Sequence, residues 1–311
     1  MIGKNALFGP LDPAPDAGYA DPPARKGFFT DTSVCIGCKA CEVACKEWNE
    51  VPDDGFNLLG MSYDNTGSLS ANTWRHVAFI EQPDRRRATV DLGMPSLPHA
   101  HGTDDGQQTA VAARDKPDFR WLMSSDVCKH CTHAACLDVC PTGSLFRTEF
   151  GTVVVQDDIC NGCGYCVPAC PYGVIERRPG PAGAKNVGIA QKCTLCYDRL
   201  GAGMTPACAQ ACPTQSIQFG DVDELRERAA QRVEKLHADG ITGARLYGAD
   251  PDDGVGGAGA FFLLLDEPEV YGLPPDPVVT TRDLPKMFNR ATAAAVTLFV
   301  GAVLSFVGRR R

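Results

Sequence analysis

Short apolar runs, separated by glycine and proline, make up most of this chain. Runs rich in β-branched and aromatic residues predict β-strands, and most of them are too short for helices. Five segments fit this pattern, at residues 73–82, 88–92, 151–156, 216–220 and 261–265. We expect the first two to pair across a turn at residues 83–85. With 32 glycines and 23 prolines among 311 residues, loops should outnumber long elements.

Two further segments predict helices. Residues 39–48 form a short candidate helix, and residues 223–238 show the period of a charged amphipathic helix. The apolar positions of the second helix share one face: Leu225, Ala229, Val233 and Leu236. Residues 1–27 and 268–285 are rich in proline and are expected to be extended.

Residues 291–307 (ATAAAVTLFVGAVLSFV) contain no charge and are near the lower length limit of a membrane span. The alternative is a helix buried in a protein core. A terminal position just before three arginines, at residues 309–311, favours an anchor. These arginines indicate a cytoplasmic C-terminus and an extracytoplasmic body. Arg282, Lys286 and Arg290, on the other side of the span, oppose this orientation.

The charge balance narrows the function classes. A net charge of −8, without a basic stripe, argues against nucleic-acid binding. Residues 1–27 lack both an apolar core and a twin-arginine signal, so no signal peptide is expected. The glycines at residues 254–259 do not match a phosphate-binding loop, and no catalytic residues are predicted.

Sixteen cysteines in four groups of four dominate the chemistry. Groups 1 to 4 are Cys35, Cys38, Cys41, Cys45; Cys128, Cys131, Cys136, Cys140; Cys160, Cys163, Cys166, Cys170; and Cys193, Cys196, Cys208, Cys212. Groups 1 and 3 have the spacing C-x2-C-x2-C-x3-C, and groups 2, 3 and 4 end in Cys-Pro. This is the bacterial ferredoxin run. The cysteine count therefore predicts four [4Fe-4S] clusters.

The cysteines allow two other interpretations. Disulfide frameworks are typical of small secreted chains. Zinc ribbons use two C-x2-C pairs separated by a dozen or more residues, and a zinc-binding scaffold remains the alternative. His130 and His133 lie between ligand cysteines and are expected to tune a cluster without binding iron. His99 and His101 are expected to be loop residues, and the arginines at 85–87 a solvated turn.

The groups predict an α+β fold with two nested dicluster units and a single transmembrane helix. If groups 2 and 3 share one unit and groups 1 and 4 the other, each fourth cysteine binds its partner group's cluster. The resulting cages A, B, C and D are Cys35, Cys38, Cys41 with Cys212; Cys193, Cys196, Cys208 with Cys45; Cys128, Cys131, Cys136 with Cys170; and Cys160, Cys163, Cys166 with Cys140. The expected division is a tail at 1–27, a first half at 28–125 completed by 186–220, a second unit at 126–185, an extension at 221–286 and the span at 287–308.

The chain from about Asp31 onward resembles the iron–sulfur subunit of membrane-bound formate dehydrogenase. The resemblance rests on DTSVCIGCKACEVACKEWN (31–49), LSANTW (69–74), CNGCGYCVPACPYG (160–173), KCTLCYDRL (192–200) and PACAQACPT (206–214). The segments DDGVGG (252–257) and YGLPPDP (271–277) and the final span extend it. The cysteine runs alone fit the corresponding subunits of polysulfide, dimethyl sulfoxide or nitrate reductases equally well.

The resemblance implies a relay subunit without a substrate site. Electrons would pass through four [4Fe-4S] clusters between a catalytic subunit that carries a molybdopterin and a membrane cytochrome that reduces quinone. The four cages match the arrangement in that family. All sixteen ligand positions are cysteine here, unlike in nitrate reductase relatives, where one is replaced.

Overall fold

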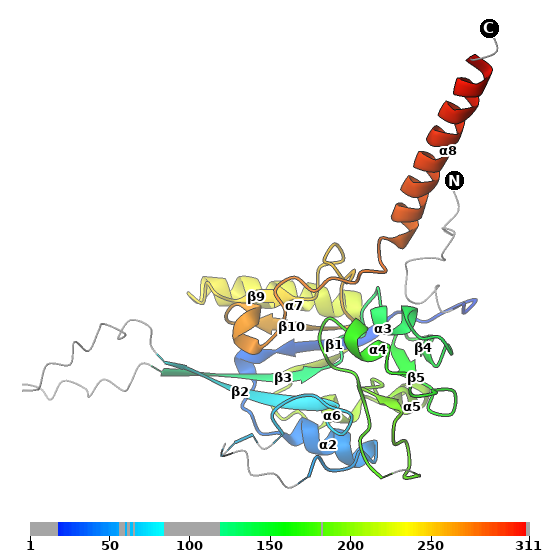
Figure 1. The fold of residues 1–311 in the computed structure, drawn as a ribbon. Helices are drawn as coiled ribbons and strands as arrows, with labels where there is room; N and C mark the ends of the chain where they lie inside the picture. The colour runs from blue at the N-terminus through cyan, green and yellow to red at the C-terminus, as the bar shows by residue number, and fades with distance from the viewer. Residues whose placement is uncertain are drawn as a thin grey trace, which may run out of the picture.

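The computed structural model describes residues 18–55, 60, 63–64, 66–83, 119–181 and 183–308. Its centre is a four-stranded sheet with the order β8-β1-β10-β9 (Figure 1). The strands are β8 (Ile217–Asp221), β1 (Lys26–Asp31), β10 (Ala260–Leu264) and β9 (Arg245–Tyr247). Strand β1 pairs antiparallel with β8 and parallel with β10. The extension after residue 221 thus supplies half of the central sheet.

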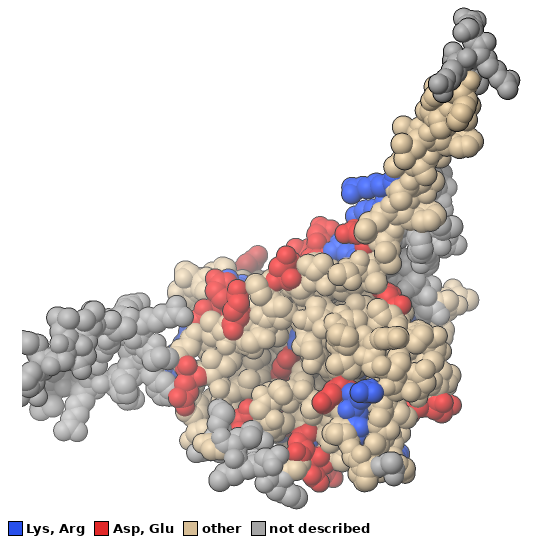
Figure 2. All heavy atoms as spheres, viewed as in Figure 1, with Lys and Arg blue, Asp and Glu red and all other residues tan. Residues whose placement is uncertain are grey.

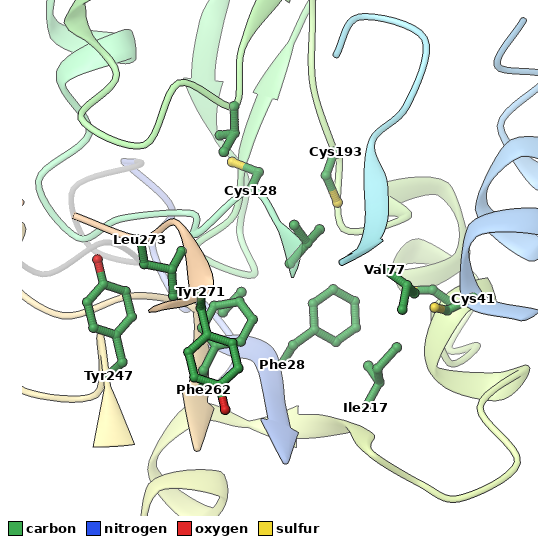
Figure 3. Packing of buried hydrophobic residues seen from close by; sticks show 14 of the residues in the cluster. Phe28, Cys41, Val77, Cys128, Cys193, Ile217, Tyr247, Phe262, Tyr271 and Leu273 are labelled. Atoms are coloured by element: carbon green, nitrogen blue, oxygen red, sulfur yellow. The ribbon is translucent and has the colours of Figure 1, made fainter. Parts of the chain in front are cut away.

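Both faces of this sheet are buried, because successive side chains of a strand point to opposite faces. Phe28 of β1 and Phe262 of β10 enter the larger core, which also contains buried cysteines (Figure 3). Phe29 and Phe261 stack at 5.5 Å on the other face. There they pack beneath helix α7 (Val222–Ala238). The sheet therefore separates a cysteine-rich core from one without cysteines.

Four antiparallel strand pairs join the cysteine groups into a ring. The remaining strands are β2 (Arg75–Pro83), β3 (Phe119–Val127), β4 (Leu145–Arg147), β5 (Val153–Val155), β6 (Glu176–Arg177) and β7 (Ala190–Gln191). One strand precedes each group and one follows it. The pairs β2–β3, β4–β5 and β6–β7 join groups that are consecutive in the chain, and β8–β1 joins group 4 to group 1. This last pair brings the two ends of the cysteine region together.

The predicted strands at 73–82, 151–156, 216–220 and 261–265 correspond to β2, β5, β8 and β10. The partner of β2 differs from the prediction. Residues 88–92 lie outside the described residues, and β2 pairs along its whole length with β3. Polar residues interrupt the apolar pattern of β3 (FRWLMSSDV), which explains why it was missed. The arginines at 85–87 and 309–311, the tail at 1–17, His99 and His101 also lie outside the described residues.

The helices inside the cysteine region are short: α2 (Ala40–Trp48), α3 (Ala135–Asp138), α4 (Cys166–Ala169), α5 (Tyr197–Gly201) and α6 (Ala207–Gln210). A 3-10 turn, η1 (Thr32–Val34), precedes group 1. Only in group 1 does the fourth cysteine lie within a helix. Cys140, Cys170 and Cys212 follow the ends of their helices, because a residue before proline is disfavoured in helical geometry. Cys170 is accordingly extended, with φ −73° and ψ 116°.

Helix α7 confirms the predicted amphipathic helix. Acidic residues in its first turn and basic residues in its last turn complement the helix dipole. Its buried side chains Val222, Leu225, Ala229 and Leu236 pack against the central sheet. Residues 268–285 contain a second 3-10 helix, η3 (Pro268–Tyr271), so this segment is not extended throughout.

Helix α8 (Leu284–Gly308) projects away from the body of the molecule (Figure 1). Residues 286–306 are long and apolar enough to cross a membrane, and none of this stretch is buried. Figure 2 shows basic side chains at the base of the helix and an almost uncharged surface above them. The alternative of a buried core helix is therefore wrong for this segment.

A protein that ends at Asp283 should keep its fold and lose its affinity for detergent. Because α8 is fully exposed, its removal takes no packing away from the core. We expect the truncated protein in the aqueous phase of a detergent phase partition and the full-length protein in the detergent phase. Equal partition of the two proteins would contradict an anchoring role for α8.

Candidate metal centres

The four cysteine groups share one unusual backbone feature. The second residue after the first cysteine has a positive φ in every group: Gly37 (66°), His130 (44°), Gly162 (73°) and Leu195 (58°). This region is unfavourable for residues with a side chain and clusters at functional sites. At Leu195 the turn directs the backbone N–H at Cys193 Sγ, 3.2 Å away. The shared turn lets backbone groups approach the sulfurs.

The proposed cages A and C each surround a hollow. One hollow is lined by the four thiols of cage A, together with hydroxyl residues. The other is lined by the four thiols of cage C. In both, three thiols come from one group and the fourth from its partner group. The fourth thiol of cage A, Cys212, lies 167 positions after Cys45, the last cysteine of group 1.

In the other two cages, B and D, the pKa shifts of the cysteines show that a thiol from one group lies close to thiols of its partner group. Burial raises the pKa of Cys45 well above its ordinary value, and the thiolates of Cys193 and Cys208 raise it further. In cage D, burial raises the pKa of Cys166 to about 11, with added contributions from Cys160, Cys163 and Cys140. Cys45 thus lies near the first three cysteines of group 4, and Cys140 lies near Cys166 of group 3.

The cages lie in the order A–B–C–D. The charge of the Cys208 thiolate, in cage B, contributes to the raised pKa of Cys41, in cage A, so these two cages are neighbours. The charge of the Cys128 thiolate, in cage C, likewise contributes to the raised pKa of Cys193, in cage B. Both residues lie in the cysteine-rich core (Figure 3). The charge of the Cys166 thiolate, in cage D, contributes to the raised pKa of Cys136, in cage C, so these two cages are also neighbours.

The two end cages reach the surface and cage B is buried. Cys38 of cage A and Cys163 of cage D are exposed, whereas every cysteine of cage B is buried. Exposed apolar side chains, Ile36 and Tyr165, lie beside the two end cages. The arrangement is a line of four sites with an accessible end on each side.

Hydroxyl groups lie within hydrogen-bonding distance of several cysteine sulfurs. Ser144 Oγ lies 3.2 Å from Cys140 Sγ. Partial burial raises the pKa of Cys140, but hydrogen bonds from Ser144, Leu145 and Thr142 hold it at about 6. In cage A, Ser125 Oγ lies 3.2 Å from Cys41 Sγ. Such bonds favour the thiolate, which is the form that binds iron.

Buried basic side chains lie beside cages A, B and C, and the sequence patterns did not predict them. Arg75, Lys129 and Lys192 are each almost fully buried. Lys192 Nζ donates to the carbonyls of Val153 and Cys193 and borders the hollow of cage C. The sequence feature that could have indicated two of them is a basic residue directly beside a cysteine of a group, as at Lys129 and Lys192.

His130 lines the hollow of cage C beside the four thiols. The backbone N–H of Val153 donates to His130 Nδ1 at 3.1 Å. Burial lowers the pKa of His130 well below its ordinary value, and the nearby charge of Lys192 lowers it further. His130 is therefore a neutral, fully buried side chain that fixes the loop of group 2. Its role as a tuning residue stays a prediction.

The residues fit a cluster better than a single ion. A zinc ion holds four sulfurs at about 2.3 Å, which requires them to converge on one point. Among the described residues, no three His, Cys, Asp or Glu side chains gather closely enough to hold one ion. Thiols spread around a hollow, with backbone and hydroxyl donors facing the sulfurs, are what a cubane cluster requires.

Comparisons with known proteins agree with this site. Residues 34–144 and residues 119–222 match two families described as 4Fe-4S dicluster domains. Over 94% of its length the chain is 35% identical to the iron–sulfur subunit of the nitrate-inducible formate dehydrogenase of Escherichia coli, covering 88% of that protein. It is 36% identical to the formate dehydrogenase iron–sulfur subunit of Haemophilus influenzae, over 86% of this chain and 74% of the relative.

A second group of relatives matches a shorter part of the sequence. A subunit of the anaerobic dimethyl sulfoxide reductase of Escherichia coli is 32% identical over 65% of the present sequence and 76% of its own length. The two dicluster matches indicate four [4Fe-4S] clusters and thus favour iron–sulfur clusters over structural zinc.

Proposed function

This polypeptide belongs to the family of formate dehydrogenase iron–sulfur subunits, and we propose that it relays electrons from a formate-oxidising catalytic subunit to a membrane subunit. It is a non-catalytic electron-transfer subunit that holds four [4Fe-4S] clusters. Cages A, B, C and D hold them, with the ligands given above. The catalytic partner carries a molybdopterin, and the membrane partner is a cytochrome that reduces quinone.

The observation that supports this proposal is the line of cages A–B–C–D, in which each end cage has an exposed cysteine and cage B is buried. Electrons can enter at one exposed end, beside Cys38 or Cys163, and leave at the other. The clusters supply the redox chemistry. The protein holds them in series, excludes water from the middle of the line, and sets each potential through hydrogen bonds to sulfur, burial and charge.

The first test is metal content and substrate-dependent reduction. Anaerobically purified protein should contain about sixteen iron atoms per chain, four for each cubane. In complex with its catalytic subunit, formate should bleach the visible absorption of the clusters, and the isolated chain should not respond to formate. Reduction by another substrate of the co-purified catalytic subunit, and not by formate, would overturn the formate assignment and keep the relay.

The alternative is the same relay for another molybdopterin reductase, such as a dimethyl sulfoxide reductase. The match to that relative supports it. The longer coverage of the formate dehydrogenase relatives favours the formate assignment, because 94% of the chain takes part in the match. Polysulfide and nitrate are distinguished from formate by the same reduction assay.

We propose that the cluster-bearing body lies outside the cytoplasm and the C-terminus inside. The three arginines at 309–311 support this orientation, while Lys286 and Arg290 oppose it. A protease site and an epitope tag added after Arg311 should be cleaved by an external protease only after the cells are opened. Loss of the tag from intact cells would reverse the orientation.

A further inference from the structure

Arg75 is the least explained charge in the cysteine-rich core. It opens strand β2 and is only 1% exposed. Its Nη1 donates to Ser125 Oγ at 3.0 Å and to the Ser125 carbonyl at 3.3 Å. Its Nε and Nη2 are buried without a hydrogen-bond partner. Within the described part of the chain, no carboxylate pairs with this guanidinium.

Two other buried arginines donate to neutral partners. Arg178 donates to Asn72, Gln191 and the carbonyl of Ala71. Arg199 donates to Gln210 and to the carbonyl of Thr205. Because an unpaired buried charge is costly, Arg75 requires an anionic partner. Its ring contact with Phe28, at 4.9 Å, does not satisfy the two free nitrogens.

The groups around Arg75 identify that partner. Burial alone would lower the pKa of its guanidinium, but the thiolates around it, Cys208 and Cys41 foremost, raise it. Cys41 belongs to cage A and Cys208 to cage B. Arg75 therefore lies close to both cage A and cage B.

A series of hydrogen bonds also joins Arg75 to cage A. Since Ser125 Oγ accepts from the guanidinium, its own hydrogen is free to be donated to Cys41 Sγ at 3.2 Å. The positive charge at one end of this series polarises the hydroxyl. It strengthens the bond to the ligand sulfur.

We propose that Arg75 sets the reduction potentials of the clusters in cages A and B, as a fixed charge close to both and through the Ser125 hydroxyl that it polarises toward Cys41. This inference rests on the proposed relay. Reduction adds an electron to a cluster that is already anionic, and a neighbouring cation stabilises the reduced form more than the oxidised form. Hydrogen bonds to sulfur act in the same direction. Arg75 thus raises both potentials.

The test is an EPR-monitored redox titration with chemical reductant, so that it does not depend on formate. Arg75→Gln should shift the reduction equilibria of the clusters in cages A and B about tenfold or more toward the oxidised form, equal to about 59 mV for a one-electron couple. The clusters in cages C and D should move less. Arg75→Lys keeps the charge, so its potentials should stay close to those of the unmodified protein. Arg178→Gln, the matched control, should leave all four potentials unchanged.

Iron analysis separates this inference from the proposed function. Unchanged potentials of the clusters in cages A and B, in an Arg75→Gln protein with full iron content, would overturn the role of Arg75 and leave the relay standing. If Arg75→Gln does not assemble, Ser125→Ala decides the question. It keeps the charge but removes the bond to Cys41, so the cluster of cage A alone should become harder to reduce. No change in that cluster would overturn the inference.

Discussion

Cys45→Ser should abolish the cluster of cage B, although Cys45 lies in group 1. The thiolates that act most strongly on Cys45 are those of Cys193 and Cys208, which belong to group 4. Removal of one of four ligands destabilises a cubane, and the cluster concerned is the one that the ligand touches. We expect a loss of about a quarter of the iron and the disappearance of one EPR signal.

Two companion variants show which signal is lost. Cys196→Ser removes a thiol from within cage B, so its spectrum should match that of Cys45→Ser. Cys38→Ser removes an exposed thiol of cage A and should give a different spectrum. If Cys45→Ser instead reproduces the spectrum of Cys38→Ser, each group binds its own cluster and the crossed ligand sets are wrong.

Removal of iron and sulfide should unfold the cysteine region while the sheet under α7 retains structure. The strands β4, β5, β6 and β7 have only two or three residues each and cannot hold themselves together. The cysteine-rich core would also contain unpaired cations, Arg75 and Lys192. Because metal binding in such sites is coupled to folding, the apoprotein should lose its cooperative transition.

Hydrogen exchange followed by mass spectrometry tests this division. Protection should fall in residues 128–215 and persist in α7 and β10, whose shared core contains no cysteine. Reconstitution with iron and sulfide under reducing conditions should restore the lost protection. Equal protection in the apoprotein and the loaded protein would contradict the idea that the clusters replace a conventional core.

The predictions succeeded where a pattern of neighbouring residues carries the information. The four cysteine groups, helix α2, helix α7 and the exposed apolar helix α8 all follow from local spacing and periodicity. The strand β3 was missed because Ser124, Ser125 and Asp126 interrupt its apolar pattern. These polar residues are present because the strand runs alongside a ligand group, and Ser125 donates to a sulfur.

Arg75 could not be assigned from the sequence, since it appears as an ordinary basic residue in a half-polar strand. Its proposed role depends on its burial and on its closeness to Cys41 and Cys208, which belong to two different cysteine groups. The sequence predicted that residues 186–220 complete the first half, but not that strand β8 pairs with β1, because the two strands are separated by about two hundred residues. Only folding brings such partners into contact.

The sequence by itself determined the number of clusters and the presence of one helix that can span a membrane, and it predicted the ligands. These properties depend on residue type and on spacing over a few positions. The tertiary structure decided the order A–B–C–D, the exposed ends and the cation close to cages A and B. Those depend on distances between segments far apart in the chain, which are fixed by the ring of strand pairs and the sheet that closes it.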